Sequence, residues 1–356
     1  MAIPSKLLTL ILILLIVISA VPTISGETNT TTPPPECSRP VGGCHNKSHA
    51  LKLKIVAIFA ILITSMIGVG LPIITRAVPA LSPDRNLFVI VKAFASGVIL
   101  ATGYMHVLPD SFDALKSECL PEKPWHAYPF TTLVAMFSAV LTLMVDSFAM
   151  SFFKKHYSKE LEEQKATKID NENAAELQNT ALHSCHSGAV KEFDSTLLRC
   201  RVVAQVLELG IIVHSVIIGL SLGASDNPCT IRPLVAALCF HQMFEGMGLG
   251  GCILQANYRA KTNAIMVFFF SATTPFGIIL GIGLSNVYTD NSPAALIVVG
   301  LLDAASAGLL NYMALVDLLA PDFMGAKLQG NIKLQAWSYV AVVLGAGGMS
   351  VMAIWA

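Results

Sequence analysis

Charged side chains are scarce in this 356-residue chain, and their scarcity excludes an ordinary soluble domain. Asp, Glu, Lys and Arg make up 13% of the residues, whereas hydrophobic residues make up 54%. A soluble globular domain is usually about a quarter charged. The composition therefore predicts an integral membrane protein whose surroundings are the lipid bilayer.

An excess of charge of one sign is also lacking, because 23 basic residues balance 23 acidic ones. Without a basic surface, nucleic acid is not expected as a partner. The chain contains no G-x-x-x-x-G-K-S/T loop for ATP phosphates and no His-Glu-x-x-His motif of a zinc protease. These absences argue against an ATP-driven pump and against an intramembrane protease, so no enzyme activity is expected.

The first 26 residues have the form of a secretory signal peptide. Lys6 precedes an apolar stretch at residues 7–19, and small residues follow at Ser19-Ala20 and Ser25-Gly26. A positive residue, a short apolar core and small residues, in this order, are typical of a signal that is cleaved. The alternative reading is an uncleaved signal anchor.

Residues 27–52 form a polar segment rich in Pro and Thr, which we expect to be flexible and extracellular. Glycosylation sequons begin at Asn29 and Asn46. Cys37 and Cys44 are separated by six residues, and in an oxidising compartment they are expected to form a disulfide. The alternative is a metal-binding role shared with nearby histidines.

Eight apolar runs reach the length of about 20 residues that a membrane-spanning helix needs. They predict an all-α membrane protein with about eight transmembrane helices. The runs fall at roughly 53–75, 87–108, 129–152, 202–223, 233–254, 263–286, 295–319 and 335–356.

The charged residues between the runs orient the chain. Loops expected in the cytosol carry most of the Lys and Arg residues, whereas the loops expected outside carry only Lys116, Lys123 and Arg232. This bias follows the positive-inside rule, so both ends of the mature chain are expected outside.

One of the cytosolic loops is long. Residues 154–200 are polar, charged and poor in aromatic side chains, which predicts disorder. The loop separates helices 1–3, in residues 53–153, from helices 4–8, in residues 201–356. Within it, HSCHSG places His183, Cys185 and His186 together as a candidate weak Zn²⁺ site, with a chance cluster as the alternative.

Two central spans contain polar residues, although an ionisable group in hydrocarbon costs about 2.5 kcal/mol or more. The stretch LELGIIVHSVIIGLSLG holds His214 and Ser215, and HQMFEG in the next span holds His241, Gln242 and Glu245. A rise of about 1.5 Å per residue brings the histidines and the glutamate to similar depths. Glu245 follows His241 by four residues, so the two share one helical face.

Two imidazoles and one carboxylate are a ligand set for Zn²⁺ or Fe²⁺. A divalent cation would also offset the cost of holding His214, His241 and Glu245 in the membrane. The alternative is that each side chain only forms a hydrogen bond to a neighbouring helix. The matched depth on adjacent spans favours the metal site.

Other acids extend this polar line in both directions. His106 and Asp110 are four residues apart at the outer end of the second span, and Asp113 follows in the exterior loop. Negative charge there would gather cations from outside. Asp146 lies deep in the third span, nearer the cytosol, and Asp303 lies in the seventh. Together these residues predict a polar path from the exterior past a site near the membrane midplane.

The same stretches resemble a known family. LELGIIVHSVIIGLSLG and HQMFEG resemble the fourth- and fifth-span motifs of the ZIP (Zrt-, Irt-like protein) metal transporters. GYMHVLPDSF, NSPAALIVVGLLDAASAGLLNYMALVDLLA and the C-terminal GGMSVMAIWA look like the plant branch that transports iron and zinc. The resemblance covers most of residues 50–356.

The resemblance implies eight helices in a three-two-three arrangement, frequently as a homodimer, with a metal path around helices 4 and 5. It implies that His214, His241 and Glu245 are metal ligands and that Ser215 and Gln242 lie beside them. It also implies that His106 and Asp110 lie on the side where metal enters and that Asp146 influences selectivity.

The function predicted from these features is a secondary carrier that moves Zn²⁺ or Fe²⁺ from the exterior, or from an organelle lumen, into the cytosol. The ligand types also accept Mn²⁺, Co²⁺ and Cd²⁺. No permanently bound cofactor is expected. The plasma membrane is the expected location, with an endomembrane of the secretory or vacuolar route as the alternative. A metal sensor without flux is the rival function, which an uptake assay would separate from a carrier.

Overall fold

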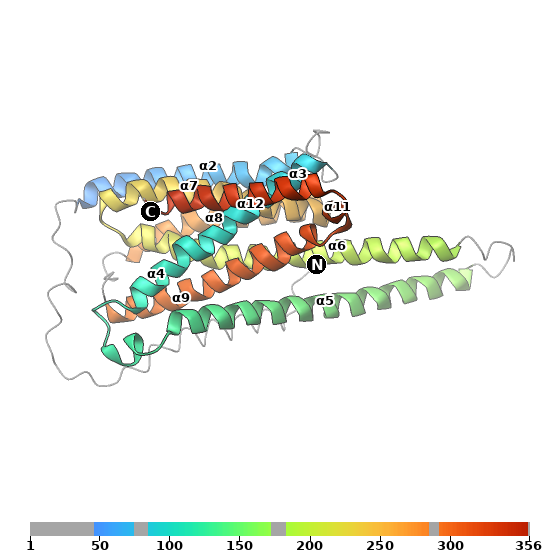
Figure 1. Cartoon of the computed structure of the whole chain (residues 1–356), viewed down its shortest axis with the longest axis horizontal. Helices are drawn as coiled ribbons and strands as arrows, with labels where there is room; N and C mark the ends of the chain where they lie inside the picture. The colour runs from blue at the N-terminus through green and yellow to red at the C-terminus, as the bar shows by residue number, and fades with distance from the viewer. Residues whose placement is uncertain (1–45, 75–84, 172–182, 285–291, 355–356) are drawn as a thin grey trace.

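The computed structural model describes residues 46–74, 85–171, 183–284 and 292–354. Within these ranges the regular structure is helical throughout, with no strand (Figure 1). The elements are α2 (Lys47–Ile74), α3 (Asn86–Ala101), η5 (Thr102–Val107), α4 (Leu108–Leu115), η6 (Glu122–His126), α5 (Phe130–Asn171), α6 (His183–Ala224), α7 (Pro228–Ala256), α8 (Ala260–Leu284), α9 (Pro293–Tyr312), η7 (Met313–Leu319), α10 (Ala320–Phe323), α11 (Ala326–Gln329) and α12 (Ile332–Met352).

Seven of the described helical segments are long and apolar enough, by length and composition, to cross a membrane. Two of them combine shorter elements, because α3, η5 and α4 form one continuous segment and α9, η7 and α10 form another. Figure 1 shows the long helices side by side as one bundle. The segments are Lys47–Ile74, Asn86–Leu115, Phe130–Phe152, Arg199–Ala224, Ala260–Leu284, Pro293–Phe323 and Ile332–Met352.

The remaining long helix of the bundle is α7. It has 29 residues, so its length is about 43 Å, which exceeds the roughly 30 Å of a bilayer core. Its composition is less apolar because it carries the HQMFEG stretch and several glycines, and many of these residues are buried inside the protein. With α7, the membrane-length helices among the described residues correspond to the eight predicted spans.

Helices of the first and last thirds pack on a central pair, α6 and α7. The closest partners are α2 with α7 and α8 with α6, while α3 packs on α12 and α5 packs on α9. The three helices before the central pair and the three after it therefore make corresponding contacts. This is the three-two-three arrangement that the family resemblance implied.

Glycines allow the closest of these approaches. A Cβ atom on Gly219 of α6 would lie 2.6 Å from the carbonyl oxygen of Thr274 in α8, and one on Gly277 of α8 would lie 2.7 Å from the carbonyl oxygen of Val216. Any side chain at these positions would force the two backbones apart. Small residues at such contacts are a common device for packing helices in lipid, where the hydrophobic effect does not drive helices together.

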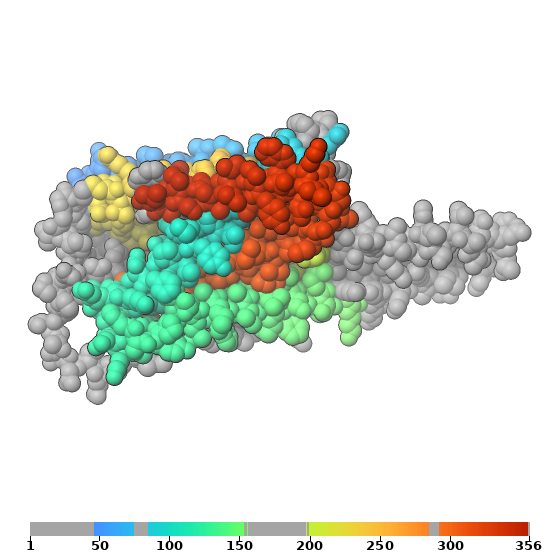
Figure 2. Space-filling view, viewed as in Figure 1, coloured from blue at the N-terminus to red at the C-terminus, as the bar shows by residue number. Residues whose placement is uncertain are grey.

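The outside of the bundle is apolar. Large side chains such as Phe137 and Phe148 of α5 and Phe268 of α8 are exposed by 68%, 69% and 65%. Figure 2 shows one face of the bundle, formed by α12, α3–α4, α9 and α5. Exposed apolar surface of this extent suits contact with lipid, in agreement with the predicted membrane protein.

The structure differs from the expected disorder of residues 154–200. Helix α5 continues to Asn171, and α6 already begins at His183. The physical reason is that Lys, Glu, Gln and Ala have high helix propensity. A helix that is already formed in the membrane also extends without a new nucleation cost.

Candidate functional site

The two central helices carry the predicted metal-binding residues. All five of these side chains are at most 2% exposed, so they lie in the interior of the bundle rather than on its lipid face. They are His214 and Ser215 on α6, and His241, Gln242 and Glu245 on α7.

Three imidazole rings from three helices are neighbours in the interior of the bundle, and we call these three side chains the histidine row. The ring centroids of His214 and His241 are 5.9 Å apart. Those of His106 and His241 are 6.4 Å apart. His241 of α7 is therefore a near neighbour of both other histidines.

His106, which was expected on the entry side at the outer end of the second span, has a buried side chain. Its side chain is only 6% exposed, and it belongs to the π-helical turn η5 rather than to a regular α-helix. Such turns often occur at functional sites because the extra residue redirects the side chains. Asp110 remains nearer the exterior, with its Oδ2 atom 3.9 Å from Nδ1 of His106.

Many polar atoms of these histidines and of the side chains beside them are buried without a hydrogen-bond partner. Both ring nitrogens of His214 and of His241, and both carboxylate oxygens of Glu245, have no hydrogen-bond partner among the described residues. The same holds for Nε2 of His106 and Oγ of Ser215. A buried polar group without a partner usually costs about 1–3 kcal/mol. Since imidazole nitrogens and carboxylate oxygens are ligands for divalent metals, a cation is a suitable partner.

These side chains do not yet converge on one point. In the described part of the chain, no group of three or more His, Cys, Asp or Glu residues is positioned to hold a metal ion. The histidines and Glu245 would therefore have to rearrange their side chains to surround a single ion.

A pocket connects this interior with the predicted outer end. Its volume is about 400 Å³. It extends from Asp113 and Asp110 on α4 to His214 on α6, and Asp303 of α9 also lines it. From the sequence, Asp303 was expected in the seventh span along the polar path, without an assigned neighbour. In the structure it lines the same pocket as Asp110. The carboxylates make this pocket suitable for collecting cations.

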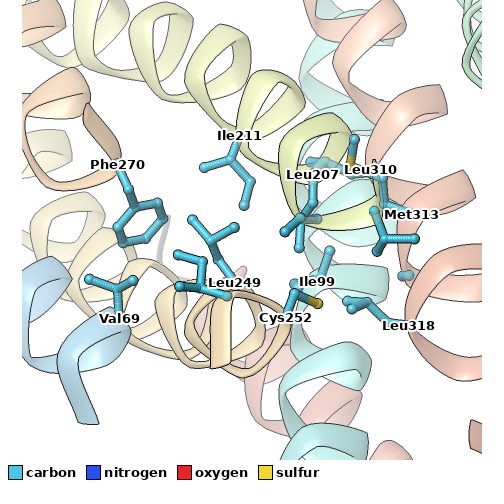
Figure 3. Packing of buried hydrophobic residues seen from close by; sticks show 14 of the residues in the cluster. Val69, Ile99, Leu207, Ile211, Leu249, Cys252, Phe270, Leu310, Met313 and Leu318 are labelled. Carbon is cyan, nitrogen blue, oxygen red and sulfur yellow. The ribbon is translucent and has the colours of Figure 1, made fainter. Parts of the chain in front are cut away.

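An apolar layer closes the side of the histidines that lies away from this pocket. Leu207 and Ile211 precede His214 on α6, and Leu249 follows Glu245 by one turn on α7; all three are fully buried. Figure 3 shows them packed with residues of α2, α3, α8, α9 and η7. A hydrated ion cannot cross this layer as it stands, so the site faces the outer pocket.

On the far side of that layer from the histidines, hydrogen bonds connect α6 with the end of α7. Arg201 Nε donates a hydrogen bond to the Ala256 carbonyl oxygen at 3.1 Å, and the Tyr258 hydroxyl donates to the Arg201 carbonyl oxygen at 2.9 Å. Burial raises the pKa of Tyr258 to about 12, so its hydroxyl remains a donor at neutral pH. These bonds hold the beginning of the membrane segment of α6 against the end of α7.

Asp146 does not join the histidine row. It lies on α5, where the hydroxyl of Tyr312 donates a hydrogen bond to its Oδ2 atom at 3.4 Å. The structure also reveals two features that the sequence reasoning missed, the buried Asp317 of η7 and the ion pair of Lys92 with Asp322. The local sequence signal for both was a charged residue inside an apolar run.

Several predicted features fall outside the described residues. They are the signal peptide at residues 1–26, the sequon at Asn29 and the disulfide between Cys37 and Cys44. The side chains of His183, Cys185 and His186 are likewise outside the described set. Asn46 is described and exposed, and its Oδ1 atom accepts a hydrogen bond from the backbone N–H of His49 at 3.0 Å, which caps the start of α2.

Comparisons with known proteins agree over nearly the whole chain. The sequence profile of the family described as ZIP Zinc transporter matches residues 51–353. Fe(2+) transport protein 2 of Oryza sativa subsp. japonica is 59% identical over 340 residues, which are 91% of this chain and 92% of that protein. Zinc transporter 7 of Arabidopsis thaliana is 56% identical over 332 residues, 90% of each chain. Fe(2+) transport protein 1 of Arabidopsis thaliana is 56% identical over 337 residues, 92% of each chain.

Proposed function

The chain belongs to the ZIP family of zinc transporters, and from this premise we propose that it carries Zn²⁺, Fe²⁺ or both from the exterior, or from an organelle lumen, into the cytosol. It is a multi-pass membrane transporter of divalent metal ions and not an enzyme. The names of its relatives include both iron and zinc transport proteins. The inward direction and the residues that carry the ion are the proposal.

One observation carries the proposal. The pocket of about 400 Å³ reaches His214 from the aspartates at one end of the bundle, while the apolar layer around Ile211 and Leu249 closes the other side of the histidines. This asymmetry suits a carrier that receives its ion from the pocket and releases it after the apolar layer opens.

In the proposed sequence of events, Asp113, Asp110 and Asp303 attract the hydrated cation. The histidines and Glu245 then replace part of its water shell. His106 and His241 connect the pocket lined by aspartates with the central site because their rings are neighbours. Inward movement of two positive charges is favoured by about 4.6 kcal/mol per 100 mV of membrane potential.

The cysteines support the assigned orientation. Cys119, in the connection between α4 and α5, and Cys229, in the first turn of α7, are both disulfide-bonded. Both lie at the end of the bundle that the Lys and Arg bias assigns to the exterior. Cys200, at the opposite end of α6, is a free thiol. Disulfides form outside the cytosol, so this distribution agrees with the positive-inside bias.

Three finer features belong to the same proposal. Mn²⁺, Co²⁺ and Cd²⁺ are candidate further substrates because they accept imidazole and carboxylate ligands. The plasma membrane is the proposed location, with glycosylation at Asn46 outside the cell. A homodimer is the proposed assembly on the basis of the family resemblance.

The test is uptake of radioactive zinc by cells that lack their own zinc uptake systems. Cells expressing the protein should accumulate zinc faster than control cells, and excess unlabelled Fe²⁺ should compete. Competition by Mn²⁺, Co²⁺ and Cd²⁺ then ranks the substrates. No uptake above the control, with the protein detected at the cell surface by labelling, would contradict inward transport across that membrane.

A further inference from the structure

Asn311 is a polar residue of α9 in the middle of the membrane segment Pro293–Phe323. Its side chain packs against the π-helical turn η5, which also carries His106. A Cβ atom on Gly103 of this turn would collide with the Asn311 amide and would lie 3.4 Å from the Ala307 carbonyl oxygen. The lack of a side chain at Gly103 therefore leaves room for the amide beside the turn.

The amide oxygen of Asn311 is not used within the protein. Its Oδ1 atom is buried and has no hydrogen-bond partner among the described residues. An asparagine that only joined two helices would accept a hydrogen bond on this atom, because buried polar atoms in proteins nearly always have a partner. Amide oxygens are also ligands for divalent cations. The unpaired oxygen of Asn311 therefore suits a partner that arrives and leaves.

Packing of α6 on α9 places Asn311 at the level of the apolar layer. A Cβ atom on Gly210 of α6 would collide with the side chains of Leu309 and Met313, which flank Asn311 in the sequence. Gly210 precedes His214 by one turn, about 6 Å along the axis, on the side away from the outer pocket. Met313 belongs to the apolar layer itself (Figure 3). Asn311 therefore places an oxygen atom where the neighbouring side chains are apolar.

One face of α9 connects this oxygen with the outer pocket. Asp303, Ala307 and Asn311 are spaced by four residues, so they share one side of the helix. Asp303 lines the pocket, and Asn311 lies two turns, about 12 Å, further along the axis. Ala307 between them is small and fully buried. A cation that moves along this face meets a carboxylate first and an amide oxygen after it.

The two oxygen types differ in charge. A carboxylate attracts a divalent ion from a distance, whereas a neutral amide oxygen replaces a water molecule of the hydration shell without adding a negative charge. Passage of an ion requires ligands that are strong enough to admit the ion and weak enough to release it. An amide at the apolar layer meets this requirement better than another carboxylate.

We propose that the Oδ1 atom of Asn311 is a transient ligand of the divalent ion as the ion passes from the histidine row through the apolar layer. This inference rests on the proposed function. When the layer opens, the amide oxygen replaces part of the hydration shell and so lowers the barrier of this step. Asn311 therefore contributes to the rate of passage, whereas the outer carboxylates contribute to capture of the ion.

The test measures initial zinc uptake against zinc concentration by cells that express the full-length variants at equal surface levels. Asn311→Leu keeps a similar size and removes the oxygen, so maximal uptake should fall by about tenfold or more. The KM should change by no more than about twofold, because capture is unaffected. Asn311→Gln keeps a neutral amide oxygen and should lose clearly less maximal uptake than Asn311→Leu.

Asn263→Leu is the matched control. Asn263 lies near the beginning of α8, and its Oδ1 atom is likewise buried without a hydrogen-bond partner among the described residues. It is not next to η5, so its replacement should leave zinc uptake like that of the wild type. The control separates the position of Asn311 from the general effect of removing a buried amide.

Thermal unfolding of the purified protein separates a ligand from a residue that only packs. Asn311→Leu should leave the unfolding temperature unchanged or raise it, because the buried oxygen has no hydrogen bond to lose. Reduced uptake together with a lower unfolding temperature would assign Asn311 a packing role and overturn the proposal. Asn311→Val, which is smaller and also apolar, takes the place of Asn311→Leu if that variant does not reach the surface, with the same expected result.

Three uptake results would also overturn the role of Asn311. They are maximal uptake by Asn311→Leu within about twofold of the wild type, equal losses in Asn311→Leu and Asn311→Gln, and a raised KM at unchanged maximal uptake. Uptake by the wild type separates these results from the proposed function. Wild-type uptake with unaffected variants rejects only the ligand role, whereas absence of wild-type uptake of every metal rejects the proposed function.

Discussion

The ammonium nitrogen of Lys92 lies 3.1 Å from Oδ2 of Asp322 and 3.2 Å from its Oδ1. Lys92 is on α3 and is 7% exposed, so it does not extend its charge to the surface as a lysine near a helix end can. Its ammonium group also contacts Oε1 of Gln255, near the end of α7, at 3.5 Å. One buried cation thus joins α3, α7 and α10.

Lys92→Met should destabilise the purified protein strongly, because it leaves Asp322 without its partner. Loss of one partner of a buried pair costs about 3–5 kcal/mol, and we expect the lower end because the Asp322 side chain is 25% exposed. Lys92→Met/Asp322→Asn should recover part of that stability. Thermal unfolding in detergent measures the difference, and a double variant as unstable as the sum of the two single variants would argue against direct coupling.

His214→Ala should reduce zinc uptake by more than about tenfold, since it removes the imidazole that lines the inner end of the outer pocket. Surface labelling must show that the variant reaches the membrane in normal amounts. Ser221→Ala, on the exposed part of the same pocket wall, is the control and should keep most of the uptake. Near-normal uptake by His214→Ala at limiting zinc would exclude His214 as an essential ligand.

Neutralising the outer and the central acid should have different kinetic effects. Asp110→Asn removes charge from the pocket near the exterior, so it should mainly raise the KM of uptake or change the preference among Zn²⁺, Fe²⁺ and Mn²⁺. Glu245→Gln removes a ligand beside His241 in the buried interior, so it should abolish maximal flux. The measurement is initial uptake rate against metal concentration at equal surface expression. Complete loss of flux in Asp110→Asn with normal flux in Glu245→Gln would contradict the proposed roles, in which Asp110 collects the ion in the outer pocket and Glu245 binds it in the buried interior.

Replacing His183, Cys185 and His186 together by alanine should leave the carrier active. These residues lie on α6 before its membrane segment, which begins at Arg199, and their proposed role is to bind Zn²⁺ weakly on the cytosolic side. We expect a change in the regulation of uptake or in apparent selectivity, measured by zinc uptake after growth in low and in high zinc. Loss of all transport by a variant that reaches the surface would show that this segment belongs to the main path.

The amino-acid sequence by itself determined the features that depend on local chemistry. Apolar runs of sufficient length specify membrane helices, and the distribution of Lys and Arg orients them. The spacing of four residues also placed His241 and Glu245 on one face of a single helix. The sequence also indicated that His214 needs a partner, because an ionisable residue in an apolar run is costly to bury wherever the helix packs.

Only the tertiary structure decided which partners meet. His106 and His241 are neighbours because η5 redirects one helix and α7 packs at the centre of the bundle. Lys92 reaches Asp322 across 230 positions of sequence. Local periodicity contains no information about such distances, since they arise from how separate helices pack and where a helical turn widens.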